Sequence, residues 1–210
     1  MKKHIGWIAG ATAAVLVAAG AITYAVAEDG SGGGGPSVPS AEGADAGFAR
    51  DMAVHHQQAV EMSYIIRDRT TDTEVRRLAY DIAQTQANQR GMLLGWLDLW
   101  DLPKVSAKPP MSWMGMGDMP ERGDGSLMPG MATDTELKKL GTLNGKQAEI
   151  FYLQLMTDHH KGGIHMAEGC VSKCTVEVEK NLAQGMVDAQ QSELAAMKQM
   201  LKERGAQPRD

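Results

Sequence analysis

Apolar residues recur at alternating spacings of three and four between residues 45 and 68, which is the pattern of a helix with one packed face. The face carries Asp45, Phe48, Met52, His55, Ala59, Met62 and Ile66. The same order of residue types returns 104 positions later, as Glu149, Tyr152, Met156, His159, Gly163, Met166 and Cys170. A second apolar stripe follows each copy, with Gln86 and Gln89 matching Gln190 and Glu193. The chain therefore contains an internal duplication.

Each copy predicts a helical hairpin. Short breaks at 70–73 and 172–175 divide the copies into helices of about 25 residues, and no segment shows the alternation typical of strands. Thr133 and Glu136 have the spacing of a capping box, so a short helix is expected there, ended by Gly141 and Asn144-Gly145. Two duplicated hairpins predict an all-α fold, a four-helix bundle, with a methionine-rich connector between its halves.

The ends of the sequence give the domain boundaries. Residues 5–27 are uncharged and mostly apolar and follow Lys2 and Lys3, so 1–27 is expected to be a signal peptide or a membrane anchor. The lysines place the rest of the chain outside the cytoplasm. Residues 28–44 are rich in Gly, Ser and Pro and predict a flexible linker. The helical domain then spans 45–204, with repeat one at 45–101, the connector at 102–132 and repeat two at 133–204.

The net charge of the chain limits the kinds of molecule that it is expected to bind. The formal net charge is −5 and becomes −7 without Lys2 and Lys3, so the domain beyond them is acidic. Nucleic acid is therefore not an expected partner, because binding to phosphate needs a basic surface. Contact with a membrane is expected only through the N-terminal segment.

Two histidine pairs carry the candidate chemistry. Four of the six histidines form them, and methionines stand at the same positions around each pair. Imidazole and thioether bind late transition metals, and thioether favours Cu(I). The predicted ligands are Met52, His55, His56 and Met62 in the first copy and Met156, His159, His160 and Met166 in the second. Ordinary core packing, or neutral histidines bonded to Gln86 or Gln190, would be the alternatives.

Helix geometry makes the members of each pair unequal. Adjacent helical residues point about 100° apart, so both cannot lie at the centre of one face. His55 and His159 share the methionine stripe and are expected on the inner seam. His56 and His160 are expected at its edge, where a facing helix, a second metal or solvent would meet them.

The connector supplies a separate soft-metal candidate. Its methionines stand among Gly, Pro and Asp, a composition that does not predict an ordinary core, and Trp113 could shield them. They are Met111, Met114, Met116, Met119, Met128 and Met131. Clustered thioethers favour Cu(I). A disordered flap or an adaptable surface for protein contact is the alternative.

The sequence alone leaves the roles of several polar residues undecided. Cys170 and Cys174 predict a local disulfide in an oxidising compartment, with copper ligation as the alternative. Asp45 and Glu149 could be metal ligands, could orient a histidine, or could favour the helix dipole from the first turn. His165 is expected to be exposed or an accessory ligand.

The segments MAVHHQQAVEM and MTDHHKGGIHM, together with Gln86, Gln190 and the Met-Pro-Gly-Met run at 128–131, resemble the family called domain of unknown function 305. The resemblance covers residues 45–204. It implies a ferritin-like helical bundle, and some members are secreted or periplasmic copper-binding proteins. It also implies that the methionines and histidines of the two segments are copper ligands. Gly162-Gly163 and His165 depart from the first copy, and the cysteine pair is not part of the family pattern.

The expected function is copper binding outside the cytoplasm, for sequestration, transfer or resistance, without enzymatic turnover. Cu(I) is the favoured ion and Cu(II) the alternative, and a copper transporter or chaperone is a candidate partner. One alternative is a ferritin-like di-metal oxidoreductase, which usually carries Glu-x-x-His on two helices, a motif that the sequence lacks. A helical protein-interaction module without metal is the other.

Overall fold

Four long helices form two hairpins in the computed structural model, which describes residues 38–118 and 123–209. Helices α1 (Ala44–Arg67) and α2 (Thr73–Leu99) make the first hairpin, and α4 (Gly145–Lys173) and α5 (Glu177–Glu203) make the second. The connector holds a 3-10 turn, η1 (Ser112–Met114), and the short helix α3 (Asp134–Thr142). No strand occurs in the described residues, so the predicted all-α class is confirmed.

The duplication is visible in the helix boundaries. Helix α5 begins and ends 104 residues after α2, at both ends without a shift. The breaks at 70–73 and 172–175 are confirmed within a few residues. Thr133 and Glu136 form the predicted capping box, in which each side chain accepts a hydrogen bond from the other residue's backbone N–H.

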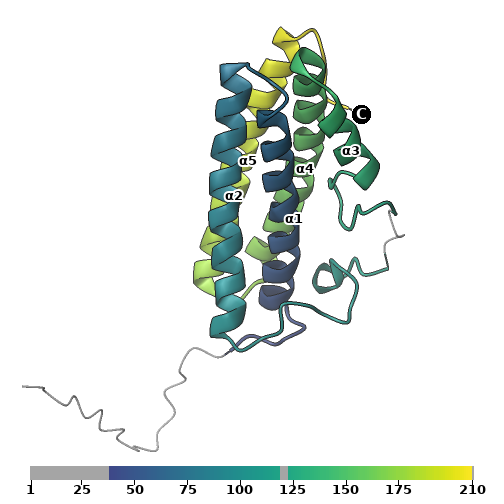
Figure 1. Ribbon diagram of the computed structural model, residues 1–210. Helices are drawn as coiled ribbons and strands as arrows, with labels where there is room; N and C mark the ends of the chain where they lie inside the picture. Colours follow the sequence, from purple (N-terminus) through teal and green to yellow (C-terminus); the bar gives the residue numbers. More distant parts are fainter. Residues whose placement is uncertain (1–37, 119–122, 210) are drawn as a thin grey trace, which may run out of the picture. The chain divides into compact units, whose positions relative to one another are not determined.

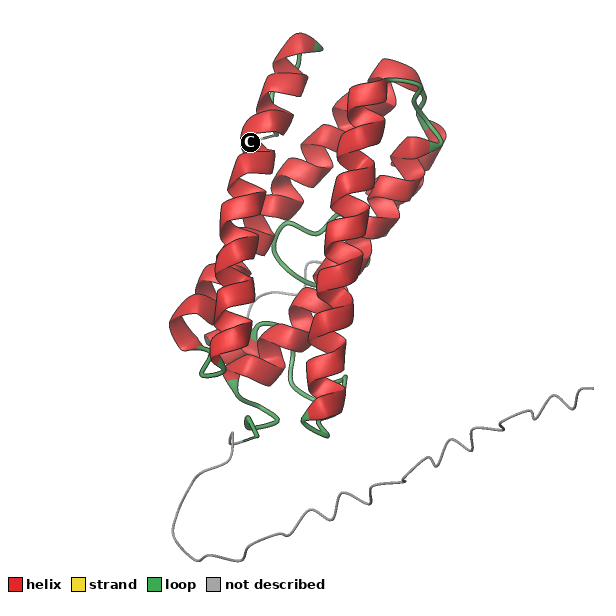
Figure 2. Cartoon of the chain, turned by 90° about the vertical axis from the view of Figure 1, so that its left-hand side faces the viewer, coloured by secondary structure: helices red, strands yellow, loops and turns green. Residues whose placement is uncertain are grey.

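The hairpins pack on each other through α1 and α4, which run in opposite directions along the centre of the domain (Figure 1). The view from the side shows the long helices lying roughly along a common axis (Figure 2). Buried apolar side chains form two clusters, one toward the start of α1 and one toward its end. The level between the clusters carries the four histidines of the two pairs.

Asp45 and Glu149 hold the hairpins together at opposite ends. The Asp45 carboxylate on α1 accepts hydrogen bonds from the backbone N–H groups of Thr175 (2.7 Å) and Val176 (2.8 Å), where α5 begins. Glu149 on α4 accepts from the hydroxyl of Thr70 (2.6 Å), in the turn between α1 and α2. Each repeat thus stabilises the turn of the other. Neither acid orients a histidine, and the hydrogen bonds of Asp45 serve the start of α5, not the dipole of its own helix.

The N-terminal predictions lie mostly outside the described residues. This holds for the signal peptide or anchor at 1–27 and for most of the linker at 28–44. Residues 38–43 are irregular, and α1 begins at Ala44, one residue before the predicted boundary. Within the described parts of the chain, no helix is both long and apolar enough for a membrane span.

Candidate metal centre

His55 and His159 meet face to face where α1 and α4 cross. Their ring centroids lie 3.7 Å apart with an angle of 31° between the planes, and both side chains are fully buried. The Nε2 atom of His159 lies 3.0 Å from the backbone carbonyl oxygen of His55. A carbonyl can only accept, so this nitrogen carries the proton. Both residues thus lie in the buried contact between α1 and α4, in agreement with the prediction that they occupy the inner seam.

His56 and His160 are also fully buried, and each turns to the second helix of its own hairpin. Nε2 of His56 lies 2.9 Å from the side-chain oxygen of Gln89 on α2, and Nε2 of His160 lies 2.7 Å from a carboxylate oxygen of Glu193 on α5. Solvent is therefore excluded as the environment of these edge histidines.

The hydrogen-bond partners of the edge histidines differ from those of one alternative that the sequence left open. That alternative paired neutral histidines with Gln86 or Gln190, whereas the side chains one helical turn further on, Gln89 and Glu193, bind the rings. The side-chain oxygens of Gln86 and Gln190 are buried and have no hydrogen-bond partner among the described residues. The sequence did hold one signal for these partners, because Gln89 and Glu193 occupy equivalent positions of the two repeats. Polar side chains on a helix are usually exposed, so the pair did not suggest a buried contact.

One nitrogen of every ring is left without a hydrogen-bond partner. Nδ1 of His55, His56, His159 and His160 is buried and unpaired within the described residues. In three of these rings Nε2 is the donor, so Nδ1 carries a free lone pair in the neutral ring. For His55 both nitrogens lack a partner. Unpaired buried nitrogens of this kind are unfavourable for folding alone, and they are the form in which imidazole binds a metal.

Burial lowers the pKa of three of these rings, those of His55, His56 and His159. Loss of solvation lowers the pKa of His55 to about 3, and the neighbouring His56 and His160 lower it further than burial alone would. Loss of solvation likewise lowers the pKa of His56 to about 3, against the hydrogen bond of Gln89, which raises it. The pKa of His159 falls well below its usual range, first through burial and then through His55. A metal ion would meet little competition from protons.

Buried methionines flank the histidine level on both sides. Because α1 and α4 are antiparallel, Met52 of repeat one and Met166 of repeat two belong to one apolar cluster. Met62 and Met156 belong to the other. All four side chains are fully buried. The two copies of the motif therefore face each other across one centre, with thioethers of both repeats above and below the rings.

The last part of the connector crosses this centre between α1 and α4. Gln58 on α1 holds it through a pair of hydrogen bonds with the backbone of Ala132, at 2.9 and 2.7 Å. On α4 the matching position is Gly162, where a Cβ atom would lie 2.0 Å from the carbonyl oxygen of Pro129. The same carbonyl acts on His55, whose pKa it raises slightly against the larger effect of burial.

Three connector methionines belong to the core. Met111, Met128 and Met131 are buried in the same cluster as Met52 and Met166. Met114 and Met116 are half-buried and pack against that cluster, while Met119 lies outside the described residues. The expectation that this composition would not form an ordinary core is therefore wrong for the three buried side chains. Gly and Pro allow the loop to follow the helix surfaces, and the methionines then fill the space beneath it.

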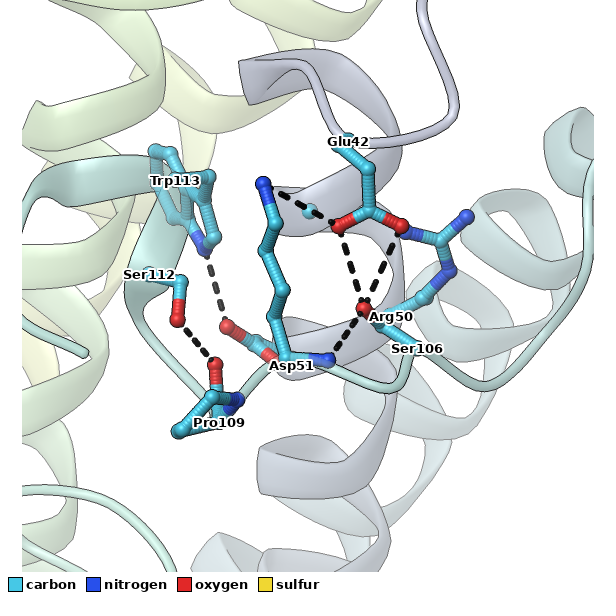
Figure 3. A pocket seen from close by; sticks show the side chains of 9 residues that line it. Glu42, Arg50, Asp51, Ser106, Pro109, Ser112 and Trp113 are labelled. Atoms are coloured by element: carbon cyan, nitrogen blue, oxygen red, sulfur yellow. Dashed lines mark hydrogen bonds and ion pairs between the residues drawn. The ribbon is translucent and has the colours of Figure 1, made fainter.

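Asp51 fixes the first part of the connector. Its carboxylate accepts a hydrogen bond from the backbone N–H of Met111 (2.7 Å). It also accepts one from the indole N–H of Trp113 (2.9 Å), which Figure 3 shows. Burial raises the pKa of Asp51, and these two hydrogen bonds oppose the shift. Trp113 also contacts Phe48 edge-on, with ring centroids 5.9 Å apart. The indole covers the apolar cluster that contains the methionines.

Cys170 and Cys174 are joined by a disulfide, with an S–S distance of 2.09 Å. Glu179, a fully buried acid that the sequence pattern did not single out, lies beside them. Among the described residues, these three form the one group of His, Cys, Asp or Glu side chains whose ligand atoms all lie within 4.8 Å of each other. The histidines of the centre do not bring three nitrogens that close together, so a metal there would also need sulfur. His165 is exposed, as expected.

Comparisons with known proteins place this architecture. The model of the family described as "Domain of unknown function (DUF305)" matches residues 45–201. A member of this family from Streptomyces coelicolor is 70% identical, with a TM-score of 0.76, over 81% of this chain and 99% of that one. A fragment of a Deinococcus radiodurans member is 27% identical, with a TM-score of 0.64, over 80% and 99% of the two chains.

A more distant likeness concerns a metal-bound structure. CopM in its Cu(I)-bound form is 19% identical and has a TM-score of 0.58, over 76% of this chain and 96% of that one. At this identity the likeness shows the fold. None of the curated proteins is similar enough to match. The family model covers most of the sequence and nearly all of the two repeats, and the chain belongs to the DUF305 family.

Proposed function

We propose that this protein binds copper outside the cytoplasm, at a centre between α1 and α4 formed by the histidine pairs and their methionines. One observation carries the proposal: the Nδ1 atoms of four fully buried histidines have no hydrogen-bond partner among the described residues. Folding alone favours apolar residues at such positions, since an unpaired buried polar atom costs about 1–3 kcal/mol. A bound metal ion would remove that cost.

Cu(I) is the ion that fits this donor set best. The centre offers imidazole nitrogens and thioether sulfurs, and soft thioethers select Cu(I) among the biological metals. Both donors are neutral here, so a monovalent cation adds the least charge to a buried site. The Glu193 carboxylate would strengthen His160 as a ligand, since a hydrogen bond from the far ring nitrogen to a carboxylate raises the basicity of the coordinating one.

Relatives support the choice of ion and compartment. CopM has structures with Cu(I), Cu(II) and silver bound, and silver is a soft ion of the same kind as Cu(I). The Streptomyces coelicolor relative is named as a secreted protein. The uncharged run at 5–27 in this chain agrees with export.

A narrow cleft between α2 and α5 offers a route for the ion. Its lining includes Gln89 and Glu193, the partners of the two edge histidines, together with Gln86, Met186 and Gln190. The amide oxygens of Gln86 and Gln190, which have no hydrogen-bond partner among the described residues, would offer the ion neutral donor atoms along this path. We infer that copper enters and leaves here, delivered to or taken from a transporter or chaperone.

Binding without turnover is the part of the proposal that separates it from a di-metal oxidoreductase. Such enzymes bind their metals with several carboxylates at the centre of the bundle, whereas the buried acids Asp45 and Glu149 bind the turns at its ends. Oxygen consumption with bound iron would favour the enzyme. Lost contact with a partner protein and unchanged metal content, after Met52, His55, Met156 and His159 are replaced, would favour an interaction module.

The test is Cu(I) affinity measured by competition with a chelator of known affinity. Replacing His55 and His159 by Leu should weaken binding by on the order of 100-fold or more, since even loss of a group that only orients a ligand costs 10–100-fold. The matched control is His165→Gln, an exposed histidine on the same helix as His159, which should leave the affinity unchanged. Unchanged affinity in the double variant, with its helical content intact, would refute the proposal.

A further inference from the structure

The internal duplication provides a comparison for the disulfide region. Cys170, Cys174 and Glu179 of repeat two correspond to Ile66, Thr70 and Val75 of repeat one. Ile66 and Val75 are fully buried and belong to the apolar cluster at the opposite end of the domain. The same fold position is thus filled by ordinary core residues in one repeat and by two thiols and an acid in the other. The fold does not require the second set.

The disulfide does not staple separate elements. Both cysteines belong to the last turn of α4, and the backbone N–H of Cys174 already donates to the carbonyl of Cys170 at 2.8 Å. A crosslink over four positions closes a very short loop, so it restricts the unfolded chain least. The turn is therefore held by its backbone whether the sulfurs are oxidised or reduced.

Glu179 is the unexplained member of the group. It is fully buried in the first turn of α5, and neither of its carboxyl oxygens has a hydrogen bond of acceptable geometry. Burial raises the pKa of Glu179 to about 9, and the nearby Asp45 carboxylate raises it further. The carboxyl oxygen and both sulfurs lie within 4.8 Å of each other. A buried acid whose near polar neighbour is the Asp45 carboxylate thus lies beside two sulfurs, at a position where its counterpart in repeat one is a valine.

We propose that reduction of the Cys170–Cys174 disulfide opens a second, redox-gated Cu(I) site, in which the two thiolates bind the ion and the Glu179 carboxyl group is the third donor. The site lies in the same cluster as Met52 and Met166, apart from the histidines. Thiolates are softer than thioethers and select Cu(I) more strongly. The proposal concerns other residues than the histidine centre and does not depend on it.

The redox step requires a dithiol reductant, as supplied by thiol–disulfide exchange proteins. The S–S bond between Cys170 and Cys174 breaks, each sulfur takes up one proton, and the two electrons come from the dithiol, which becomes a disulfide. Cu(I) then replaces the two thiol protons, which leave to solvent. A dithiol would reach Cys174 first, because this residue is 6% exposed while Cys170 is fully buried.

The first test compares the full chain before and after reduction. Bound Cu(I) is measured by competition with bicinchoninate, using a phosphine reductant that is removed before copper is added. Reduction should add one Cu(I) per chain, with a thiolate-to-copper absorption band in the ultraviolet. Equal copper in both redox states would overturn the proposal.

Variants separate this site from the histidine centre. The triple variant C170I/C174T/E179V rebuilds the side chains of repeat one, so it should fold, keep the copper that binds without reduction, and lose the copper that depends on it. Reduction-dependent copper that persists in this variant would overturn the proposal. The His55→Leu, His159→Leu variant should behave in the opposite way. It should lose the copper that binds without reduction and keep the copper that binds only after reduction.

The role of Glu179 is tested with a neighbour as control. E179Q should weaken the reduction-dependent site by about tenfold, a loss typical of groups that support a metal ligand. E177Q changes an exposed acid in the same turn of α5 and should have no effect. If E179Q leaves the affinity unchanged, Glu179 is not a donor and the three-donor arrangement is wrong.

Discussion

The first hairpin and the second share a histidine pair with methionines at the same positions around it, and three of the positions at which they differ change contacts of the domain. Gln58 is replaced by Gly162, Gln89 by Glu193, and Val75 by Glu179. The first difference lies where the connector crosses, the second where a histidine meets the outer helix, and the third beside the disulfide. The residues that the repeats share form the histidine centre, and the three residues that differ give each hairpin contacts that the other lacks.

Gln58 and Gly162 show how one loop breaks the symmetry. The connector exists once, so it cannot contact both repeats alike. Repeat one binds its backbone with a side-chain amide, and repeat two makes room with a missing Cβ. Gly162 in the second copy therefore reflects packing of the connector, while Gly163 leaves room for the Gln190 side chain. A difference in affinity between two separate sites is not needed to explain either glycine.

The largest expected effect concerns the histidines that the repeats share. The folded pKa values of His55 and His56 lie at about 3, below the ordinary value of 6.5, and that of His159 is also lowered. Between about pH 3 and pH 6.5 the unfolded chain binds more protons than the folded protein, because its histidines are protonated and the buried ones are not. The free energy of unfolding must therefore fall as the pH falls below about 6.5. Each such histidine contributes about 1.4 kcal/mol per pH unit. Glu179 acts in the opposite direction, but with a single proton.

Urea unfolding of the metal-free protein between pH 7 and pH 5 measures this effect. His55→Leu should reduce the slope of stability against pH, whereas the exposed-site variant His165→Gln should keep it. A free energy of unfolding that stays constant over this range would contradict the buried, neutral state of the rings.

The next effect tests the contact that distinguishes Gly162 from Gln58. Gly162→Ala places a Cβ against the Pro129 carbonyl, so the loop or the helix must move, at a cost of about 1–3 kcal/mol. Gly185→Ala is the matched control, a helical glycine with open space around it, and it should stabilise by about 0.5–1 kcal/mol. Thermal unfolding of both variants measures the difference. Equal shifts of the same sign would show that the connector does not lie on α4.

An effect of similar size and opposite sign is expected where Glu179 replaces the valine of repeat one. E179V should stabilise the metal-free, oxidised protein by about 1–3 kcal/mol at neutral pH, since it removes an unpaired buried polar group. The raised folded pKa of about 9 means that the wild type loses stability as pH rises from about 4.5 toward 9. The advantage of E179V should therefore grow from pH 5 to pH 8. A variant that is less stable than the wild type at pH 8 would show that the acid is satisfied in the fold.

The smallest effect separates Glu193 from Gln89. Glu193→Gln makes the two hairpins alike and replaces a charge-assisted hydrogen bond to His160 by a neutral one. Copper affinity should fall by less than about tenfold, and Gln89→Glu should raise it by a similar factor. Chelator competition on the two variants would detect both changes. Shifts in the same direction would rule out a role for the charge.

The sequence predicted the helices well because their signals are local. Spacings of three and four defined the faces of α1 and α4, and Thr133 with Glu136 defined the start of α3. The candidate site was predicted as residue types, which the duplication marked as unusual. The partners of the rings were missed because the choice of Gln89 over Gln86 depends on how far two helices slide past each other, which no local pattern records.

By itself, the sequence determined the all-helical class, the duplication, and a set of histidines and methionines suited to a soft metal. Only the tertiary structure decided that α1 and α4 run antiparallel, so that Met52 meets the cluster of Met166 and His55 stacks on His159. It also buried three connector methionines and set Glu179 beside the disulfide. The reason is physical: periodicity fixes which face of a helix is buried, whereas the neighbour on that face depends on contacts between residues more than a hundred positions apart.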